Sequence, residues 1–277
     1  MRVHHLSCGT FCPWSARLIN GRGPILGAGR LVCHCLLLEG RDGLTLVDTG
    51  FGTADVADPG RFHPLFKALT RPRFDLEETA LRQLAALGFK AADVRHLVVT
   101  HLDLDHAGGL ADFPDAEVHV LAPEHAAAMA PLPRERLRYV AAQWAHGPRW
   151  VVHPPAGERW FGFDAVRALD GAEEVLLVPL HGHTRGHAGV AVRTPDGWLL
   201  HCGDAYFFHG ELLPDGAHCP AGLSVFQWLV QLDGPARLRN QARLRELRRH
   251  HGSEVRLFSA HCPVEYERFA PPADRAA

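Results

Sequence analysis

A single decapeptide, THLDLDHAGG at residues 100–109, constrains this chain more than any other stretch of its sequence. It places two histidines and two aspartates within six positions, in the pattern H-x-D-x-D-H. The β-branched run at residues 93–101 predicts a short strand that ends where this cluster begins. Functional side chains converge most easily in a loop held by a rigid scaffold. We therefore expect the fold to bring this loop to a polar site.

Further residues of the metal-ligand type stand at the start or end of predicted strands. His187 lies in HGHTRGHAGV, Asp204 ends LLHCGD and His261 ends LFSAH. One such residue alone is an ordinary capping aspartate or a surface histidine. An ordered set of seven predicts a shared metal site instead. The seven are His101, Asp103, Asp105, His106, His187, Asp204 and His261.

The bulk composition limits the class of protein. A chain of 277 residues with 47% apolar content is long enough for one large domain with a sizeable core. The formal net charge of −2 argues against nucleic acid or an anionic membrane as the main partner. No apolar run approaches the ~18 residues of a membrane span, and the N-terminus carries no apolar signal-peptide core. A cytoplasmic protein is the expectation.

Two further features have ordinary explanations. The seven cysteines are odd in number, so a disulfide framework is not expected. Cys33 and Cys35 lie in an apolar run and are predicted to be buried, reduced thiols. The arginine-rich helix predicted at residues 235–252 has an apolar side, which favours a solvated surface helix over a nucleic-acid contact.

The predicted strands and helices alternate, and several strands follow each other through tight turns. This order indicates a single domain of mixed sheets covered by helices, with a frayed tail at residues 270–277. A helix is predicted from Asp75 to Gly88, with Asp75 as its N-cap. Strands are predicted at residues 31–39, 44–50, 93–101, 116–122, 173–180, 187–194, 197–204 and 254–261, and further helices from residue 123 and at 235–252.

Taken as an ordered set, these motifs resemble those of the metallo-β-lactamase-fold superfamily. The resemblance rests on THLDLDHAGG, HTRGHAG, GD at 203–204, SAH at 259–261 and LVDTG at 46–50, and it spans about residues 31 to 262. It implies an α/β (α+β) fold, a four-layer αββα sandwich of two mixed sheets with the metals at one edge. Residues 123–172 and 205–232 would be insertions that shape the pocket. The N-acyl homoserine lactonases and glyoxalase-II-like thioesterases are the most similar branches.

The resemblance also implies a ligand set for two divalent metal ions. Site one would use His101, Asp103 and His187, site two would use Asp105, His106 and His261, and Asp204 would bridge both. Asp48 in LVDTG and His183 would support the ligands from behind without binding metal themselves.

Such a pair of ions can share one water, lower its pKa towards neutrality and so provide hydroxide at pH 7. The hydroxide would attack the carbonyl of a lactone, ester or thioester, with Asp105 holding it and moving its proton. Tyr206 is the candidate donor to the developing oxyanion, because the similar lactonases place a tyrosine close to this point. Aromatic residues in both predicted insertions indicate an apolar pocket and a small-molecule substrate with an apolar part.

Asp103 departs from the commoner H-x-H-x-D-H pattern of these hydrolases. An unpaired carboxylate in a buried cluster is costly, which favours metal ligation by Asp103 over a solvated side chain. A carboxylate oxygen is a harder ligand than an imidazole nitrogen, so iron and manganese become alternatives to zinc as the bound metal. Zinc remains the first candidate. A similar carboxylate occurs in the flavo-diiron branch, so a di-iron redox protein working with a separate flavoprotein is the alternative function. A glyoxalase-II-like thioesterase and a non-catalytic binding module are further alternatives.

Overall fold

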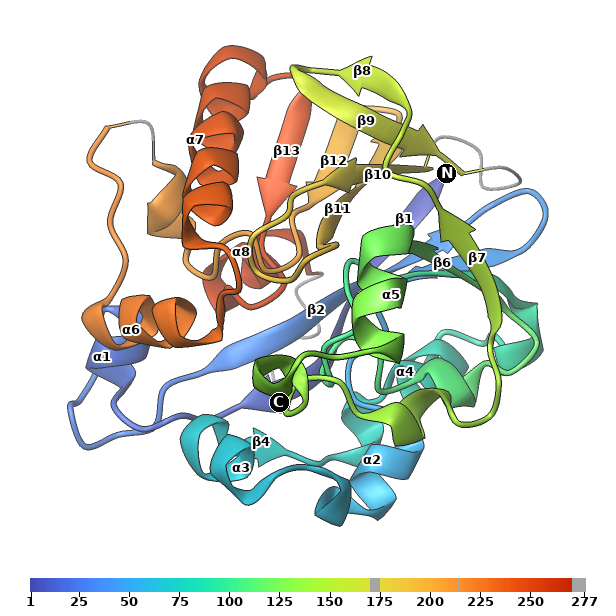
Figure 1. Cartoon of the computed structure of the whole chain (residues 1–277), viewed down its shortest axis with the longest axis horizontal. Helices are drawn as coiled ribbons and strands as arrows, with labels where there is room; N and C mark the ends of the chain where they lie inside the picture. The colour runs from blue at the N-terminus through green and yellow to red at the C-terminus, as the bar shows by residue number, and fades with distance from the viewer. Residues whose placement is uncertain (170–174, 214, 271–277) are drawn as a thin grey trace.

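The computed structural model describes residues 1–169, 175–213 and 215–270. Two β-sheets lie against each other, and helices cover the outer side of each (Figure 1). The predicted αββα sandwich with two mixed sheets is therefore confirmed. Apart from Ala270, the predicted tail lies outside the described residues.

The first sheet has seven strands and the second has six. In spatial order, the first contains β4 (Pro72–Arg73), β1 (Arg2–Phe11), β2 (Leu31–Glu39), β3 (Leu44–Val47), β5 (Val94–Val98), β6 (Glu117–Leu121) and β7 (Arg149–His153). The second contains β13 (Val255–Phe258), β12 (Gly197–His201), β11 (Ala188–Thr194), β10 (Val175–Pro179), β9 (Phe163–Ala168) and β8 (Glu158–Trp160).

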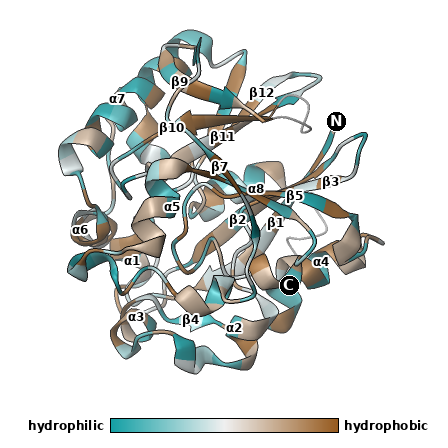
Figure 2. Cartoon of the chain, turned by 45° about the vertical axis from the view of Figure 1, so that its right-hand side comes forward, coloured by the Kyte–Doolittle hydropathy of each residue, from teal (hydrophilic) through white to brown (hydrophobic). Residues whose placement is uncertain are grey.

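Apolar side chains fill the space between the sheets and the space beneath the covering helices. In Figure 2, hydrophobic stretches of the ribbon, in brown, run through strands of both sheets. Leu36 and Val98 of the first sheet meet Val190 of the second in the central core. Burial of such side chains is the main force that holds the layers together. The helices are α1 (Ala16–Asn20), α2 (Thr53–Ala57), α3 (Pro64–Thr70), α4 (Ala80–Ala86), α5 (Ala122–Met129), α6 (Ala221–Val230), α7 (Gly234–His251) and α8 (Pro263–Phe269).

The strand directions place the predicted site at one edge of the sandwich. β3 pairs in parallel with β5, and β12 pairs in parallel with β13. Carboxyl ends of neighbouring parallel strands meet at the same edge of a sheet. Asp48 follows β3, the H-x-D-x-D-H loop follows β5, Asp204 follows β12 and His261 follows β13.

The helix predicted at residues 75–88 is divided in the structure. Asp75 caps a short 3-10 turn by accepting from the amide of Glu77, and Thr79 then caps α4 through the amide of Arg82. Two capping residues four positions apart compete for one helix start, and the threonine begins the α-helix. The sequence also missed β1 and β7 to β9, whose polar residues interrupt the strand pattern.

The two predicted insertions are largely built into the fold. Residues 149–168 supply β7, β8 and β9, and most aromatic residues of this span pack into the cores, as Trp144 and Phe163 do. Only the short segment around Arg134 and Arg138 reaches the pocket described below. From the second predicted insertion, α6 lines that pocket.

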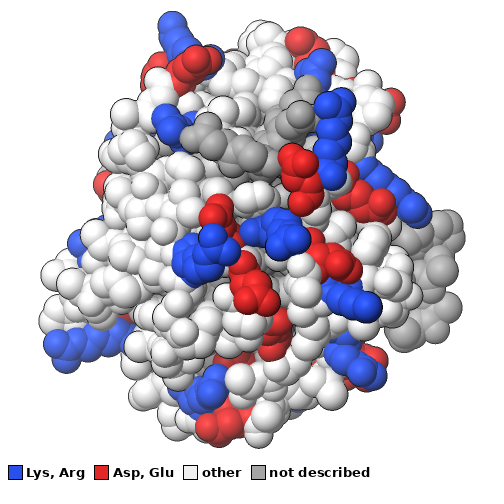
Figure 3. Space-filling view, turned by 90° about the vertical axis from the view of Figure 1, so that its right-hand side faces the viewer, with Lys and Arg blue, Asp and Glu red and all other residues white. Residues whose placement is uncertain are grey.

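Surface charge on one side of the molecule is mixed. In the view of Figure 3, acidic and basic side chains alternate over the face that turns away from α1 and α6. In α7, several arginines are fixed by partners: Arg237 donates to Gln227, and Arg243 lies over the ring of Phe163. Among the described residues, no helix is both long and apolar enough to cross a bilayer.

Candidate metal centre

Asp48 anchors the loop that carries the H-x-D-x-D-H motif. Its backbone has a left-handed conformation, with φ of 53°, directly after β3. Its carboxylate accepts hydrogen bonds of 2.7 and 2.8 Å from the amide and hydroxyl of Thr100 and lies 2.8 Å from His106 Nδ1. Burial alone would raise the pKa of Asp48, but His106 outweighs this and lowers it to about 2. A charged carboxylate therefore fixes both ends of the loop.

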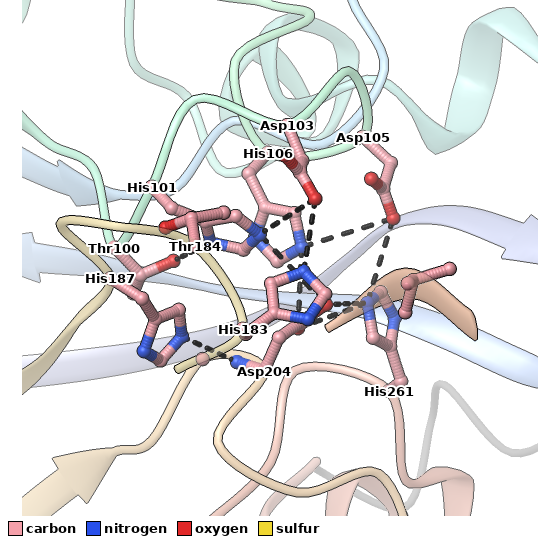
Figure 4. A network of polar contacts seen from close by, with 12 residues as sticks. Thr100, His101, Asp103, Asp105, His106, His183, Thr184, His187, Asp204 and His261 are labelled. Atoms are coloured by element: carbon pink, nitrogen blue, oxygen red, sulfur yellow. Dashed lines mark hydrogen bonds and ion pairs between the residues drawn. The ribbon is translucent and has the colours of Figure 1, made fainter. Parts of the chain in front are cut away.

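The carboxylate of Asp204 divides the clustered side chains into two groups (Figure 4). Its Oδ2 lies 3.4 Å from His183 Nε2 and 3.8 Å from His101 Nε2. Its Oδ1 lies 3.1 Å from His261 Nε2 and 3.4 Å from His106 Nε2. His261 Nε2 also lies 3.2 Å from Oδ2, so this histidine contacts both oxygens of Asp204.

An aspartate completes each group. Asp103 Oδ2 lies 3.0 Å from His183 Nε2 and 3.4 Å from His101 Nε2. Asp105 Oδ2 lies 3.5 Å from His261 Nε2 and 3.8 Å from His106 Nε2. Each group thus offers two imidazole nitrogens, one aspartate and one oxygen of Asp204.

The histidines are oriented for ligation. Nδ1 of His101 lies 2.9 Å from Thr100 Oγ1, and Nδ1 of His106 lies 2.8 Å from the carboxylate of Asp48. Nδ1 of His261 lies 2.7 Å from the backbone carbonyl of Val32. Such contacts fix the tautomer that leaves Nε2 free for metal. Nε2 of His101 and of His106 is buried without a hydrogen-bond partner in the described structure. Unpaired buried nitrogens that converge with carboxylates are the donor set of a divalent metal such as zinc.

The structure exchanges the predicted roles of His183 and His187. His187 Nδ1 donates to the carbonyl of Leu180 at 3.0 Å, and its Nε2 accepts from the amide of Asp204 at 2.8 Å. Both ring nitrogens are therefore used by the backbone. His183 instead directs Nε2 at Asp103 and Asp204, in the position predicted for His187. We therefore propose His183, in place of the predicted His187, as the ligand from this loop.

A largely buried arginine that the sequence did not reveal lies beside Asp103. Arg138 Nε is 3.3 Å from Asp103 Oδ1, and its other nitrogens donate to the carbonyls of His183 and Val230. Burial alone would raise the pKa of Asp103, but Arg138 and then His101 hold it well below its usual range. Asp103 is thus ionised, with Oδ1 facing the guanidinium and Oδ2 facing the histidines. The solvated position considered for Asp103 does not occur.

Glu124, at the start of α5, connects the two loops that supply ligands. Its fully buried carboxylate accepts from the amide of Leu102 at 3.0 Å and the hydroxyl of Tyr139 at 3.1 Å. It also accepts from the hydroxyl of Thr184 at 2.6 Å and the amide of Gly186 at 3.1 Å. One side chain therefore fixes the His101–Asp103 loop against the His183 loop.

Tyr206 does not face the pocket, where a donor to the oxyanion would have to lie. Its ring is fully buried in the core beneath α7, and its hydroxyl donates to both carboxylate oxygens of Glu265 at 3.1 Å. It is absent from the residues that line the pocket, where the next residue, Phe207, takes the position over the cluster. The ring of Phe207 stacks on His261 with centroids 4.9 Å apart. Tyr206 is therefore not placed to donate to an oxyanion over the cluster, and Phe207, which lies there, has no donor group.

Cys33 approaches the second group of ligands from β2. Its sulfur lies within 4.8 Å of ligand atoms of Asp105 and His261. Burial raises the pKa of this thiol well above its usual value, so it is held as a neutral thiol. All seven cysteines are free, in accord with the prediction of reduced thiols.

A pocket of about 640 Å³ opens over the cluster. Asp103, Asp105, His183, Asp204 and His261 are among its lining residues. Apolar side chains from α1, α3 and α6 and the loops beside them form much of the remaining wall. A polar cluster in an apolar pocket of this size is the usual form of a small-molecule site.

Comparison with known proteins agrees with this geometry. Residues 28–249, more than half of the chain, match the metallo-β-lactamase superfamily. The chain belongs to that superfamily. This membership, together with a relative named as a probable metallo-hydrolase, places it among metallohydrolases, the class of enzyme that the sequence predicted.

Individual relatives refine the comparison. A protein of Mycobacterium tuberculosis named as a probable metallo-hydrolase is 46% identical over 96% of this chain and 82% of its own length. An N-acyl homoserine lactonase of a Bacillus species is 33% identical over 58% of each chain. A crystal structure of the B. thuringiensis protein AiiA with N-decanoyl-L-homoserine bound superposes with a TM-score of 0.72, covering 96% of this chain and 95% of that one at 20% identity. The last likeness establishes the shared fold.

Replacement of Glu124 tests its role as the link between the loops. Glu124→Ala leaves two amides and two hydroxyls buried without their acceptor, so we expect unfolding free energy to fall by about 3–5 kcal/mol. Urea unfolding measures this change. Glu124→Gln keeps one acceptor oxygen and should lose less. Equal small losses in both variants would contradict a linking role.

Glu265 should make stability depend on pH. Burial raises the pKa of Glu265 to about 7 from a usual value of 4.5. The folded state therefore favours the protonated acid, and the stability it provides is present below pH 4.5 and is lost as the pH rises through 7. Relative to Glu265→Gln, we expect the wild type to lose roughly 2–4 kcal/mol between about pH 5 and pH 8 in urea unfolding. A gap between the two proteins that stays constant with pH would count against this assignment.

Proposed function

We propose that this protein is a dinuclear metal-dependent hydrolase that acts on the carbonyl of a lactone, ester or thioester with an apolar chain. One observation carries the proposal: the carboxylate of Asp204 lies between two ligand groups and contacts histidines of both. The first group is His101, Asp103 and His183, and the second is Asp105, His106 and His261. A shared carboxylate between two complete ligand groups suits two divalent ions, as in two-metal hydrolases.

Two ions held there would supply Lewis acidity and a hydroxide nucleophile at neutral pH. The residues around them orient the reaction. Asp105 lines the pocket beside the second ligand group, so its carboxylate is placed to take a proton from the attacking water and return it to the leaving group. Phe207 stacks on His261 and excludes water from that side of the cluster.

The pocket wall supports the choice of an apolar substrate. Phe66, Leu223 and Phe226 line the pocket beside the cluster, and no tyrosine is among its lining residues. An acyl chain buried against such side chains gains binding energy in proportion to the apolar area removed from water. Zinc is our first candidate for the metal, because each group contains two imidazoles, and iron or manganese are the alternatives.

Metal analysis of single-site variants tests the ligand assignment. We expect about two metal ions per chain in the wild type and about one in His183→Ala and in Asp103→Ala, with hydrolysis at least about 10-fold slower. His187→Ala is the matched control: it removes an imidazole from the same loop but should retain about two ions. Loss of an ion from His187→Ala and not from His183→Ala would restore the sequence-based assignment.

A substrate panel tests the reaction. Chelator treatment should abolish hydrolysis of a long-chain acyl lactone or ester, and added zinc should restore it, because the nucleophile depends on metal. The panel includes thioesters, a β-lactam and a phosphodiester, each with the fully loaded protein. Absence of turnover across the panel would contradict the proposal. Full occupancy by iron without hydrolysis would favour the redox alternative.

A further inference from the structure

The rim of the pocket is unusually apolar for a solvent-exposed surface. Trp14 is 63% exposed and lines the pocket together with the exposed side chains of Leu65 in α3 and Leu229 in α6. Trp228, on the same helix as Leu229, is 67% exposed, and Leu26, in the loop after α1, is 89% exposed. Contiguous exposed apolar groups of this kind mark a surface that binds a partner. We call this face the pocket rim, formed by residues 13–30, 64–71, 132–138 and 221–230.

Contacts between the helices and loops of the pocket rim bring its four segments close together. α1 packs against α6, where Leu18 lies against Gly222. Arg71, just after α3, places its guanidinium 4.0 Å from the centre of the Trp14 ring. Residues distant in sequence therefore form one continuous surface around the pocket opening, on the side of the molecule with α1 and α6 in Figure 1.

The charge of the pocket rim is almost entirely positive. Its four segments contain a single acidic residue, Glu135, which is fully buried and bridges to Arg185 at 2.8 Å. Six cationic side chains of the rim have no ion-pair partner in the described part of the chain. They are Arg17, Arg22, Lys67, Arg71, Arg134 and Arg136. The chain as a whole has a net charge of −2, and the face seen in Figure 3 carries both signs.

From this combination we propose that the pocket rim binds the surface of an anionic lipid bilayer. Tryptophan and leucine side chains enter the interface between headgroups and acyl chains, while surrounding arginines contact the negative headgroups. Each basic residue close to an anionic surface adds to the attraction. A spanning helix is not required, because exposed apolar side chains enter only the interfacial layer.

A second copy of this chain fits the pocket rim less well. A two-fold interface sets the same surface against itself, so each cation would face a cation and would find no acidic partner on the rim. An anionic bilayer supplies the missing negative charge over the whole surface. It also faces the opening of the pocket, so an apolar substrate dissolved in lipid reaches the cluster without crossing water.

Flotation with lipid vesicles tests the proposal with the metal-loaded, full-length protein. The wild type should float with vesicles of phosphatidylcholine containing about one third phosphatidylglycerol, but not with phosphatidylcholine alone. Trp228→Ser and Arg22→Glu together should weaken binding at least about 10-fold, and a rise in salt from about 0.05 to about 0.5 M should weaken it as well. Neither residue lines the pocket.

The matched control makes the same two kinds of substitution on the other side of the molecule. Leu87→Ser with Lys90→Glu also removes an exposed apolar side chain and reverses a positive charge, at the end of α4, and should leave binding unchanged. Thermal unfolding checks that both double variants fold. Binding needs no turnover, so this result is independent of the proposed reaction.

Two outcomes would overturn the inference. One is the absence of flotation with anionic vesicles, or equal loss of binding in the rim and control variants. The other is a wild-type dimer in sedimentation that Trp228→Ser and Arg22→Glu dissociate, because the rim would then be an interface between two copies.

Discussion

Three carboxylates, those of Asp103, Asp105 and Asp204, lie around one cluster of histidines, and the rest of the site depends on how their repulsion is balanced. Without compensation, burial would drive such groups to protonate. For Asp103 and Asp204, histidines on three loops and the guanidinium of Arg138 provide the opposite charge. The remaining unpaired nitrogens of His101 and His106 leave room for divalent ions in the same space.

The replacement of a histidine by Asp103 has a definite electrostatic effect. Two divalent ions, three carboxylates and a hydroxide sum to zero, whereas the commoner ligand set with two carboxylates sums to +1. Arg138 restores that unit of charge from outside the ligand set, because it contacts the carboxylate oxygen that faces away from the histidines. The metal pair would then remain in surroundings as electropositive as those of the histidine-containing sites.

Much of this arrangement followed from the sequence, and the failures have identifiable causes. The fold and the gathering of these residues at one edge were predictable because metal-type residues recur at strand ends. His183 and His187 share one short motif, HGHTRGH, and only the tertiary contact between His187 and the amide of Asp204 separates them. Glu124 and Arg138 act across loops distant in sequence, so no local pattern marks them. Tyr206 and Phe207 differ by a single position, which decides which ring enters the core and which faces the pocket.

The contact between Arg138 and Asp103 also limits how this chain can change over evolutionary time. A histidine at position 103 alone would leave a largely buried guanidinium beside the proposed metal pair with its carboxylate partner removed. Loss of Arg138 alone would leave the carboxylate without its cation. The two positions should therefore be exchanged together, and descendants of such a protein would pass between the two ligand patterns only through a weakened intermediate.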